Sequence, residues 1–238
     1  MAAAHIWPAV AIRDMFMIET TRMPNWPTLR IGDLAPDFEA RTTMGSVSLS
    51  GYRGRWLVLF SHPADFTPVC TSEFIALSRA AERFAELNCA LLAVSVDSLY
   101  AHLAWVRAIR DAFGVTVSFP IVEDPAMSIG LAYGMIAVGT TDAAAMRTSY
   151  FIDPEGVIRA TVCYPATVGR SVDEMLRVVA ALQRVDADDV VTPANWQPGD
   201  DVLLPPDEEQ AAALAMHDDV TWFYRSKADR PDLTGKRK

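Results

Sequence analysis

Two short, continuous apolar runs constrain the fold of this chain more than any other feature. Residues 56–60 read Trp-Leu-Val-Leu-Phe, and residues 90–96 read Ala-Leu-Leu-Ala-Val-Ser-Val. Each run has the length of a strand, and a strand without polar alternation is typically buried on both faces. Such strands need helices on both sides of their sheet, so the two runs predict an α/β fold.

Helical patterns follow both runs. After the first run, Thr67 is a good N-cap and Pro68 suits the first helical position. Apolar residues then recur at spacings of three and four, which predicts one helix with an inner face of Cys70, Phe74, Leu77, Ala81, Phe84 and Leu87. After the second run, Asp97-Ser98 caps a helix that ends at Gly114. Its predicted inner face carries Leu103, Val106, Ile109 and Phe113.

A hairpin and a further helix complete the pattern. Predicted strands at 147–152 and 157–164 flank the turn Asp-Pro-Glu-Gly at 153–156. Ser171 and Glu174 form a capping box that opens the next helix. The order of elements predicts a central sheet with helices on both faces, in a thioredoxin-like layout.

The texture of the sequence divides the chain into three parts. We expect residues 1–28 to form a flexible N-terminal arm, residues 29–185 a thioredoxin-like domain, and residues 186–238 a small C-terminal extension used for dimerisation. The extension contains an extended connector at 191–206 and a short helix at 207–216. It also carries apolar residues with little local core to cover them, namely Trp196, Leu203, Leu204, Trp222 and Phe223. We therefore expect a homodimer, with a larger ring as the alternative.

Composition and charge limit the partners. Lys and Arg number 21 against 30 Asp and Glu, so the net charge is −9, which argues against nucleic acid as a partner. No apolar run reaches the roughly 18 residues that span a bilayer, and the N-terminal residues lack the pattern of a secretory signal. We expect a cytoplasmic protein that binds no membrane. The cysteines, Cys70, Cys89 and Cys163, form no CxxC pair, and we expect no metal and no cofactor.

Cys70 occupies a position with chemical consequences. It lies three residues past the predicted N-cap, where free backbone N–H groups and the helix dipole favour an anion. The thiolate is the reactive form of cysteine, so this position favours a nucleophile. The alternative is that Thr67 is only a cap and Cys70 a small buried hydrophobe. Spacing alone does not decide between the two.

The sequence around Cys70 resembles the active-site segment of the peroxiredoxins. Residues 60–74 read Phe-Ser-His-Pro-Ala-Asp-Phe-Thr-Pro-Val-Cys-Thr-Ser-Glu-Phe, in which Pro63, Thr67 and Cys70 match the family's motif. His62 is similar to the one-Cys, peroxiredoxin-6-type branch of this alkyl hydroperoxide reductase/thiol-specific antioxidant superfamily. Further segments resemble the same branch at 97–105, 164–170 and 192–200, so the likeness runs from about residue 29 to about residue 206.

The resemblance implies a reaction and a set of site residues. The Cys70 thiolate would attack the O–O bond of hydrogen peroxide or an organic hydroperoxide and become a sulfenic acid, which an external thiol reduces. Thr67 and Arg147 would bind the peroxide, and Arg147 would also stabilise the thiolate. Pro63 would shield Cys70 from water, and His62 would orient the pocket.

Several residues leave alternatives open. Arg147 is otherwise a solvated charge at the start of a strand, and Glu73 either pairs with an arginine or faces solvent. We expect Cys89 and Cys163 to be inert packing residues, and no internal disulfide cycle. Two other functions remain: a thiol–disulfide oxidoreductase, which would need a second cysteine close after Cys70, and a binding or chaperone-like protein in which Cys70 is incidental.

Overall fold

The computed structural model describes residues 29–136, 145–206, 221 and 223–229. Its centre is a seven-stranded sheet. In spatial order the strands are β2 (Gly45–Ser48), β1 (Glu39–Thr42), β5 (Ile121–Glu123), β4 (Cys89–Ser95), β3 (Trp56–Ser61), β6 (Arg147–Ile152) and β7 (Ile158–Tyr164). Strands β3, β4 and β5 run parallel, whereas β6 is antiparallel to both β3 and β7. The predicted α/β fold, with its hairpin near the C-terminus, is therefore confirmed.

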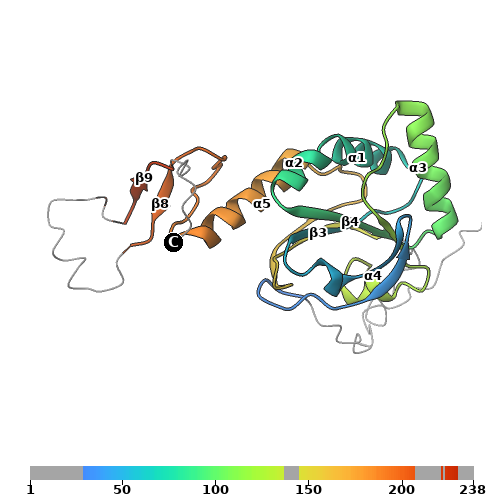
Figure 1. The fold of residues 1–238 in the computed structure, drawn as a ribbon, viewed down its shortest axis with the longest axis horizontal. Coiled ribbons are helices and arrows are strands. Elements are labelled where there is room, and N and C mark those ends of the chain that lie inside the picture. The colour runs from blue at the N-terminus through green and yellow to red at the C-terminus, as the bar shows by residue number, and fades with distance from the viewer. Residues whose placement is uncertain (1–28, 137–144, 207–220, 222, 230–238) are drawn as a thin grey trace, which may run out of the picture.

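Helices cover both faces of this sheet (Figure 1). They are the 3-10 helix η2 (Leu49–Tyr52) and the α-helices α1 (Pro68–Arg79), α2 (Ala81–Glu86), α3 (Leu99–Phe113), α4 (Ser128–Ala132) and α5 (Val172–Ala187). The single helix predicted from Cys70 to Leu87 is divided at Ala80 into α1 and α2. Among the described residues, no helix has the length and apolar character that crossing a membrane requires.

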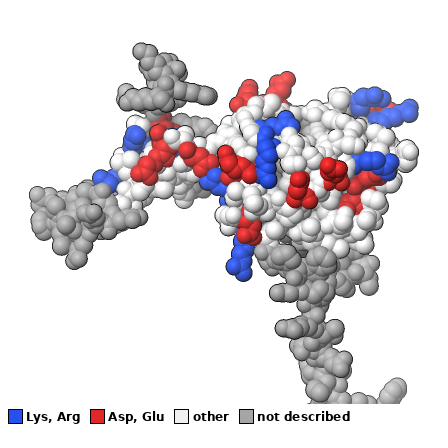
Figure 2. Space-filling view, turned by 60° about the horizontal axis from the view of Figure 1, so that its bottom comes forward, with Lys and Arg blue, Asp and Glu red and all other residues white. Residues whose placement is uncertain are grey.

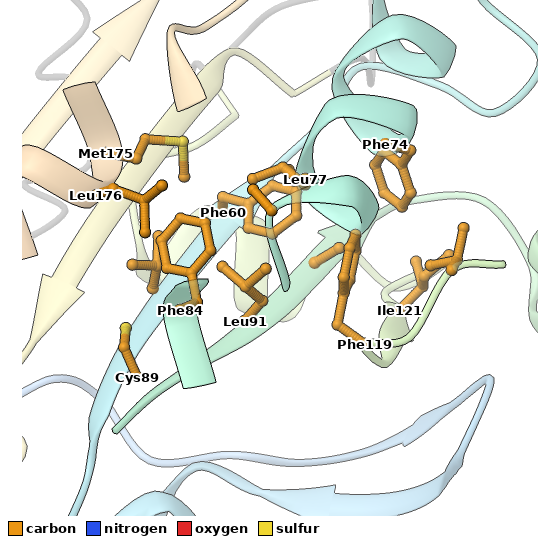
Figure 3. Packing of buried hydrophobic residues seen from close by; sticks show 14 of the residues in the cluster. Phe60, Phe74, Leu77, Phe84, Cys89, Leu91, Phe119, Ile121, Met175 and Leu176 are labelled. Atoms are coloured by element: carbon orange, nitrogen blue, oxygen red, sulfur yellow. The ribbon is translucent and has the colours of Figure 1, made fainter. Parts of the chain in front are cut away.

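Alternation along β3 divides the core into two clusters. Val58 and Phe60 pack into the cluster beneath α1, α2, α3 and α5, and Leu57 and Leu59 pack into the one on the α4 side. None of these four residues is more than 1% exposed. Figure 3 shows the first cluster, in which Phe60 meets Phe74 of α1 with ring centroids 5.9 Å apart. Strand β3 is thus held from both faces, and the loop that follows it starts from a rigid point.

The helices begin and end where their caps predict. The hydroxyl of Ser98 accepts a first-turn backbone N–H of α3, and Gly114 ends that helix in the left-handed region at φ 66°. Ser171 accepts the backbone N–H of Glu174 at the start of α5. The carboxylate of Glu174 pairs with Arg177 instead of returning to Ser171, so only half of the predicted capping box forms.

The predicted inner face of α3 is only half right. Ile109 is buried and Val106 packs against the core, but Leu103 and Phe113 do not face inward. The residues that α3 buries are His102, Trp105 and Ile109, whereas Leu103 and Phe113 are 41% and 54% exposed. Both inner residues with polar nitrogen atoms are hydrogen-bonded to other elements, His102 through Nδ1 and Trp105 through Nε1. These partners remove the cost of burying the polar atoms, so a more polar face of the helix turns inward.

The expectation that Trp196 is exposed is also wrong. It is 3% exposed, and its indole packs in a small cluster with Ala180 of α5, Val190 and Val202. Helix α5 leads from the sheet toward β8 and β9, which lie beyond its C-terminal end in Figure 1. The residues after α5 therefore bury part of their apolar surface on their own chain.

The predicted connector at 191–206 contains a strand. Strand β8 (Val202–Leu204) pairs antiparallel with β9 (Arg225–Lys227) and forms a second, two-stranded sheet. The predicted arm at 1–28, the predicted helix at 207–216 and Trp222 lie outside the described residues.

Charges of both signs are interspersed on the surface. On the face shown in Figure 2, the Lys and Arg residues lie as separate groups among Asp and Glu. Several arginines pair with neighbouring carboxylates, as in Arg83–Asp173 and Arg184–Asp229. The basic groups are therefore largely neutralised by nearby acidic ones.

Candidate active site

Cys70 lies in the first turn of α1, directly beyond the carboxyl end of β3. The chain leaves β3 through a short loop, residues 62–67, in which Phe66 adopts a left-handed conformation with φ 57°. A bulky residue in this region is strained, and such strain is common at functional sites. Thr67 then occupies the N-cap position and Pro68 the first helical position. Cys70 itself is 0% exposed.

Thr67 occupies the predicted position but does not cap the helix with its side chain. Its hydroxyl donates to the carbonyl oxygen of Ala64 at 2.8 Å and makes no bond to a first-turn amide. The hydroxyl oxygen keeps its acceptor capacity, and Thr67 does not occupy the amides of Val69 and Cys70. The positive end of the helix dipole, beside Cys70, is therefore not covered by the side-chain cap that the sequence predicts.

Arg147 reaches Cys70 from a strand distant in sequence. It opens β6, and because β6 runs antiparallel to β3, its first residues lie near the carboxyl end of β3. Its Nη1 lies 3.3 Å from the sulfur of Cys70. Its Nε and Nη2 both donate to the carbonyl oxygen of Ala166, at 3.0 and 2.7 Å. Arg147 is 2% exposed, so the alternative of a solvated charge does not hold.

Glu73 is the partner that allows two arginines to be buried at the site. One turn after Cys70, its carboxylate accepts Arg147 Nη1 at 2.8 Å and Arg170 Nη2 at 2.7 Å. The other carboxylate oxygen accepts the backbone N–H and Nε of Arg170, at 2.8 and 2.9 Å. Glu73 is 3% exposed, so the solvent-facing alternative is wrong. Burial alone would raise the pKa of Glu73, but the bonds from Arg170 and Arg147 outweigh burial and hold that pKa below its usual value.

Arg170 is a site residue that the sequence reasoning did not assign. It closes the segment 164–170, which resembles the peroxiredoxins, and that resemblance was the only signal available. Its guanidinium also lies 4.9 Å from the centre of the Phe60 ring. Two guanidiniums face one carboxylate here, so the site carries one uncompensated positive charge beside the thiol. That surplus favours an anion at the sulfur of Cys70.

His62 and Pro63 are the first two residues of the loop that leads from β3 to α1. Both residues are buried, and His62 stacks on Trp105 with ring centroids 5.3 Å apart. The Nε2 of His62 is 2.9 Å from Asp65, and the second oxygen of Asp65 is 2.7 Å from Nδ1 of His102. One possible metal-ligand atom from each of His62, Asp65 and His102 lies within 4.8 Å of the other two. Each carboxylate oxygen already has an imidazole partner, so the arrangement is a hydrogen-bonded network.

The other two cysteines differ from each other. Cys89 is the first residue of β4 and lies beside Trp56, at the amino ends of the parallel strands, whereas α1 starts near their carboxyl ends. Burial raises the pKa of the Cys89 thiol to about 12. It is therefore protonated at neutral pH, as an inert packing residue would be. Cys163 does not pack inside: it is exposed on the edge strand β7, and Thr148 donates to its sulfur at 3.4 Å.

Replacing Glu73 tests the network. Glu73→Gln keeps the shape but leaves two buried guanidiniums without a counter-charge, which should lower the free energy of unfolding by about 3–5 kcal/mol. Chemical denaturation measures this loss. The control is Arg83→Gln, which breaks an exposed ion pair and should change stability little. Equal effects of the two substitutions would contradict the assigned role of Glu73.

Two protein-family models match this chain. Residues 31–161 match the model of the AhpC/TSA family, and residues 181–216 match that of the C-terminal domain of 1-Cys peroxiredoxin. A protein named Peroxiredoxin 2 from Caldanaerobacter subterraneus subsp. tengcongensis is 47% identical over 192 residues, which cover 79% of this chain and 87% of that protein. A peroxiredoxin from Aquifex aeolicus is 46% identical over 170 residues, covering 71% and 77% of the two chains.

Solved structures show the same likeness. A yeast mitochondrial 1-Cys peroxiredoxin, whose thiol is resolved by glutathione/thioredoxin systems, superposes with a TM-score of 0.76 at 37% identity. The match covers 84% of this chain and all of that one (100%). Peroxiredoxin 6 of Arenicola marina gives a TM-score of 0.71 at 32% identity, over 79% of this chain and 88% of that one. The thioredoxin-like fold implied by the sequence is thereby confirmed. The chain belongs to the AhpC/TSA family, carries the C-terminal domain of 1-Cys peroxiredoxin, and is a thiol-dependent peroxidase.

Proposed function

We propose that Cys70 is the nucleophile that reduces hydrogen peroxide and organic hydroperoxides. The observation that carries this proposal is the Nη1 of Arg147 at 3.3 Å from the sulfur of Cys70, in a site with one surplus positive charge. The thiolate attacks one peroxide oxygen and the O–O bond breaks. The attacked oxygen keeps its hydrogen and becomes part of the sulfenic acid, while the second oxygen leaves as hydroxide or alkoxide. The leaving oxygen takes up from solvent the proton that the thiol had released, which gives water or alcohol.

Three neighbours assist this step. Arg147 holds the thiolate and stabilises the charge that develops on the leaving oxygen, because its guanidinium is fixed by Ala166 and Glu73 before the reaction begins. The Thr67 hydroxyl oxygen, whose own hydrogen is donated to Ala64, accepts a hydrogen bond from the peroxide O–H. Pro63, buried ahead of the helix, keeps water from the sulfur, which strengthens every charge interaction in the site.

The partners follow from the charge and the site. A net charge of −9 and arginines that are largely paired support a small peroxide and a thiol as partners, and argue against nucleic acid. We place the protein in the cytoplasm, because the thiol chemistry requires a reducing compartment.

Recycling of the sulfenic acid requires a thiol from outside the chain. Cys89 lies at the amino end of β4, whereas Cys70 lies beyond the carboxyl end of the neighbouring β3. The raised pKa of the Cys89 thiol, about 12, also makes it a poor nucleophile. The yeast relative, which uses glutathione/thioredoxin systems, supports an external thiol for this chain also.

Self-association is supported by exposed apolar surface in two places. Near the start of α1, a groove of about 430 Å³ is lined by Phe66, Ile75 and Phe113, and the two phenylalanines are 60% and 54% exposed. At the other end, Tyr224 is 58% exposed beside β9. We propose a homodimer, with assembly into a ring as the larger alternative.

The cysteines are tested one by one. Cys70→Ser removes the nucleophile and should abolish peroxide consumption by the purified protein, measured with an external thiol present. Cys89→Ser and Cys163→Ser should keep it, because neither sulfur contacts Arg147 in the described structure. Full turnover by Cys70→Ser would refute the assignment.

Arg147 is tested by removing its charge. Arg147→Ala loses one preorganised donor, so the second-order rate of peroxide reduction should fall about 10²- to 10³-fold. Arg159→Ala is the control, because Arg159 lies on the neighbouring strand β7 and pairs with Asp153 and Asp186 instead. Stopped-flow measurement of the two variants decides whether the guanidinium acts on the reaction.

Recycling is tested by the fate of oxidised protein. One equivalent of peroxide without added thiol should leave a sulfenic acid on Cys70 that dimedone traps, and no disulfide on non-reducing gels. In Cys163→Ser, dimedone should trap the sulfenic acid of Cys70 to the same extent. A stoichiometric Cys70–Cys163 disulfide in peptide mapping would instead make this an atypical two-Cys enzyme.

Association is tested by light scattering at micromolar concentration. The wild type should be a dimer or larger. Phe113→Glu places a charge in the groove and should reduce the mass if that surface is an interface, whereas the exposed Arg110→Glu on the same helix should not. A monomeric wild type would contradict the proposal.

A further inference from the structure

A buried carboxylate joins two histidines behind the active-site loop. Asp65 bonds His62 Nε2 with one oxygen, at 2.9 Å, and His102 Nδ1 with the other, at 2.7 Å. The side chains of His62 and His102 are 0% exposed and that of Asp65 is 2% exposed. The three groups therefore exchange hydrogen bonds with one another in an environment closed to solvent.

The protons of this network can be assigned from its chemistry. An ionised carboxylate only accepts hydrogen bonds, so both nitrogens that face Asp65 must carry hydrogen. Nδ1 of His62 and Nε2 of His102, the remaining nitrogens, are buried and have no hydrogen-bond partner. A proton on either would create a buried N–H without an acceptor and a charged ring, which costs far more than an unused lone pair. Both rings are therefore neutral, with opposite tautomers.

The ionisation of the groups agrees with this assignment. Burial lowers the pKa of His62, and its bond to Asp65 only partly offsets burial. Burial alone would raise the pKa of Asp65, but bonds from His102 and His62 outweigh it and lower that pKa. Two further carboxylates face the network: Asp97 accepts the backbone N–H of Asp65, and Glu123 accepts that of Leu99 at the start of α3.

The network is joined to the reactive helix through His62. Besides stacking on Trp105, the His62 ring meets the edge of Phe74 with centroids 4.9 Å apart, and Phe74 follows Cys70 by one turn of α1. A neutral ring adds no charge to the surplus that Arg147 and Arg170 provide. Its Nδ1 keeps a lone pair that can accept a hydrogen bond, which an Nδ1–H could not do.

We propose that Asp65 and His102 are positioning residues that hold His62 in its neutral form, with hydrogen on Nε2 and the lone pair on Nδ1. Through the same two bonds they fasten the loop that carries Pro63 and Thr67 to α3. His102 acts from α3 through Asp65: the two imidazole rings lie 6.0 Å apart between centroids, and the hydrogen bonds that link them run through that carboxylate. For its effect on the reaction, the proposal rests on the proposed role of Cys70.

The decisive variant is Asp65→Asn, which keeps the shape but has one acceptor and one donor group. Its amide can accept from only one imidazole and must donate to the other, so one of the two rings must switch its tautomer. Peroxide reduction should fall about 10- to 100-fold, because the site is then misaligned or wrongly protonated. His102→Leu removes the N–H that holds Asp65 and should also lower the rate, whereas the conservative His102→Asn retains an N–H that can reach Asp65 and should rescue both the His62 tautomer and the rate.

The tautomers are read by ¹⁵N NMR of the imidazole nitrogens, in a chain with four histidines. In the wild type at pH 7, His62 should show hydrogen on Nε2 alone and His102 hydrogen on Nδ1 alone. Because burial lowers the pKa of His62 in the folded state, the His62 signature should persist as the pH falls below about 6.5, where a free histidine takes up its proton.

Two controls separate this role from stability and from the nucleophile. Asp124→Asn alters another buried carboxylate, which bonds Gly130 and Ser128, and should leave both tautomers unchanged. Cys70→Ser should abolish activity yet preserve both tautomers, so a failure of Cys70 as nucleophile would be seen separately. A charged His62 at pH 7, unswitched rings in Asp65→Asn, or a wild-type rate in that variant would overturn the proposal.

Discussion

The carboxylate of Glu73 is the contact on which the rest of the site depends. It joins α1 to Arg147 at the start of β6 and to Arg170 just before α5, so one side chain gathers three segments far apart in the sequence. Without its charge, two guanidiniums would be buried against like charge. With it, one positive charge remains beside Cys70. The stability of the fold and the proposed reactivity of the Cys70 thiol therefore depend on the same buried ion network.

The sheet explains why these partners meet. Strand β3 is packed from both faces and delivers the loop and α1 at its carboxyl end. Because β6 pairs antiparallel with β3, its first residue, Arg147, arrives at that same end. Cys89 is the first residue of β4, and because β3 and β4 are parallel, it lies at the amino end of β3, away from the site. Strand direction alone thus separates one cysteine from the site and brings the arginine to it.

Sequence reasoning succeeded for most local interactions and failed for those between distant segments; the local failures are the side-chain cap of Thr67 and the Glu174 half of the capping box. The caps at Ser98, Gly114 and Ser171 depend on atoms within a few residues, and all three form. The inner face of α3 was assigned from apolar spacing, yet His102 turns inward because Asp65 supplies a partner from another segment. Nothing in the spacing of α3 shows that such a partner exists.

The C-terminal extension illustrates the same limit. Trp196 is covered by Ala180 of α5 together with Val190 and Val202, and the spacing of these residues in the sequence does not show that they meet. In the same way, the exposure of Cys163 follows from the place of β7 at the edge of the sheet. Both outcomes depend on which elements become neighbours, and that is a property of the assembled sheet.

By itself, the sequence determined the α/β class, the two buried strands, the hairpin, the caps at Ser98, Gly114 and Ser171, and the place of Cys70 in the first turn of a helix. Apolar runs, caps and turn residues act over short distances, so they can be read along the chain. The tertiary structure decided that Arg147, Glu73 and Arg170 form one network and that Asp65 stands between two histidines. Charges and hydrogen bonds of this kind act only between groups within a few ångströms, and only folding brings those groups together.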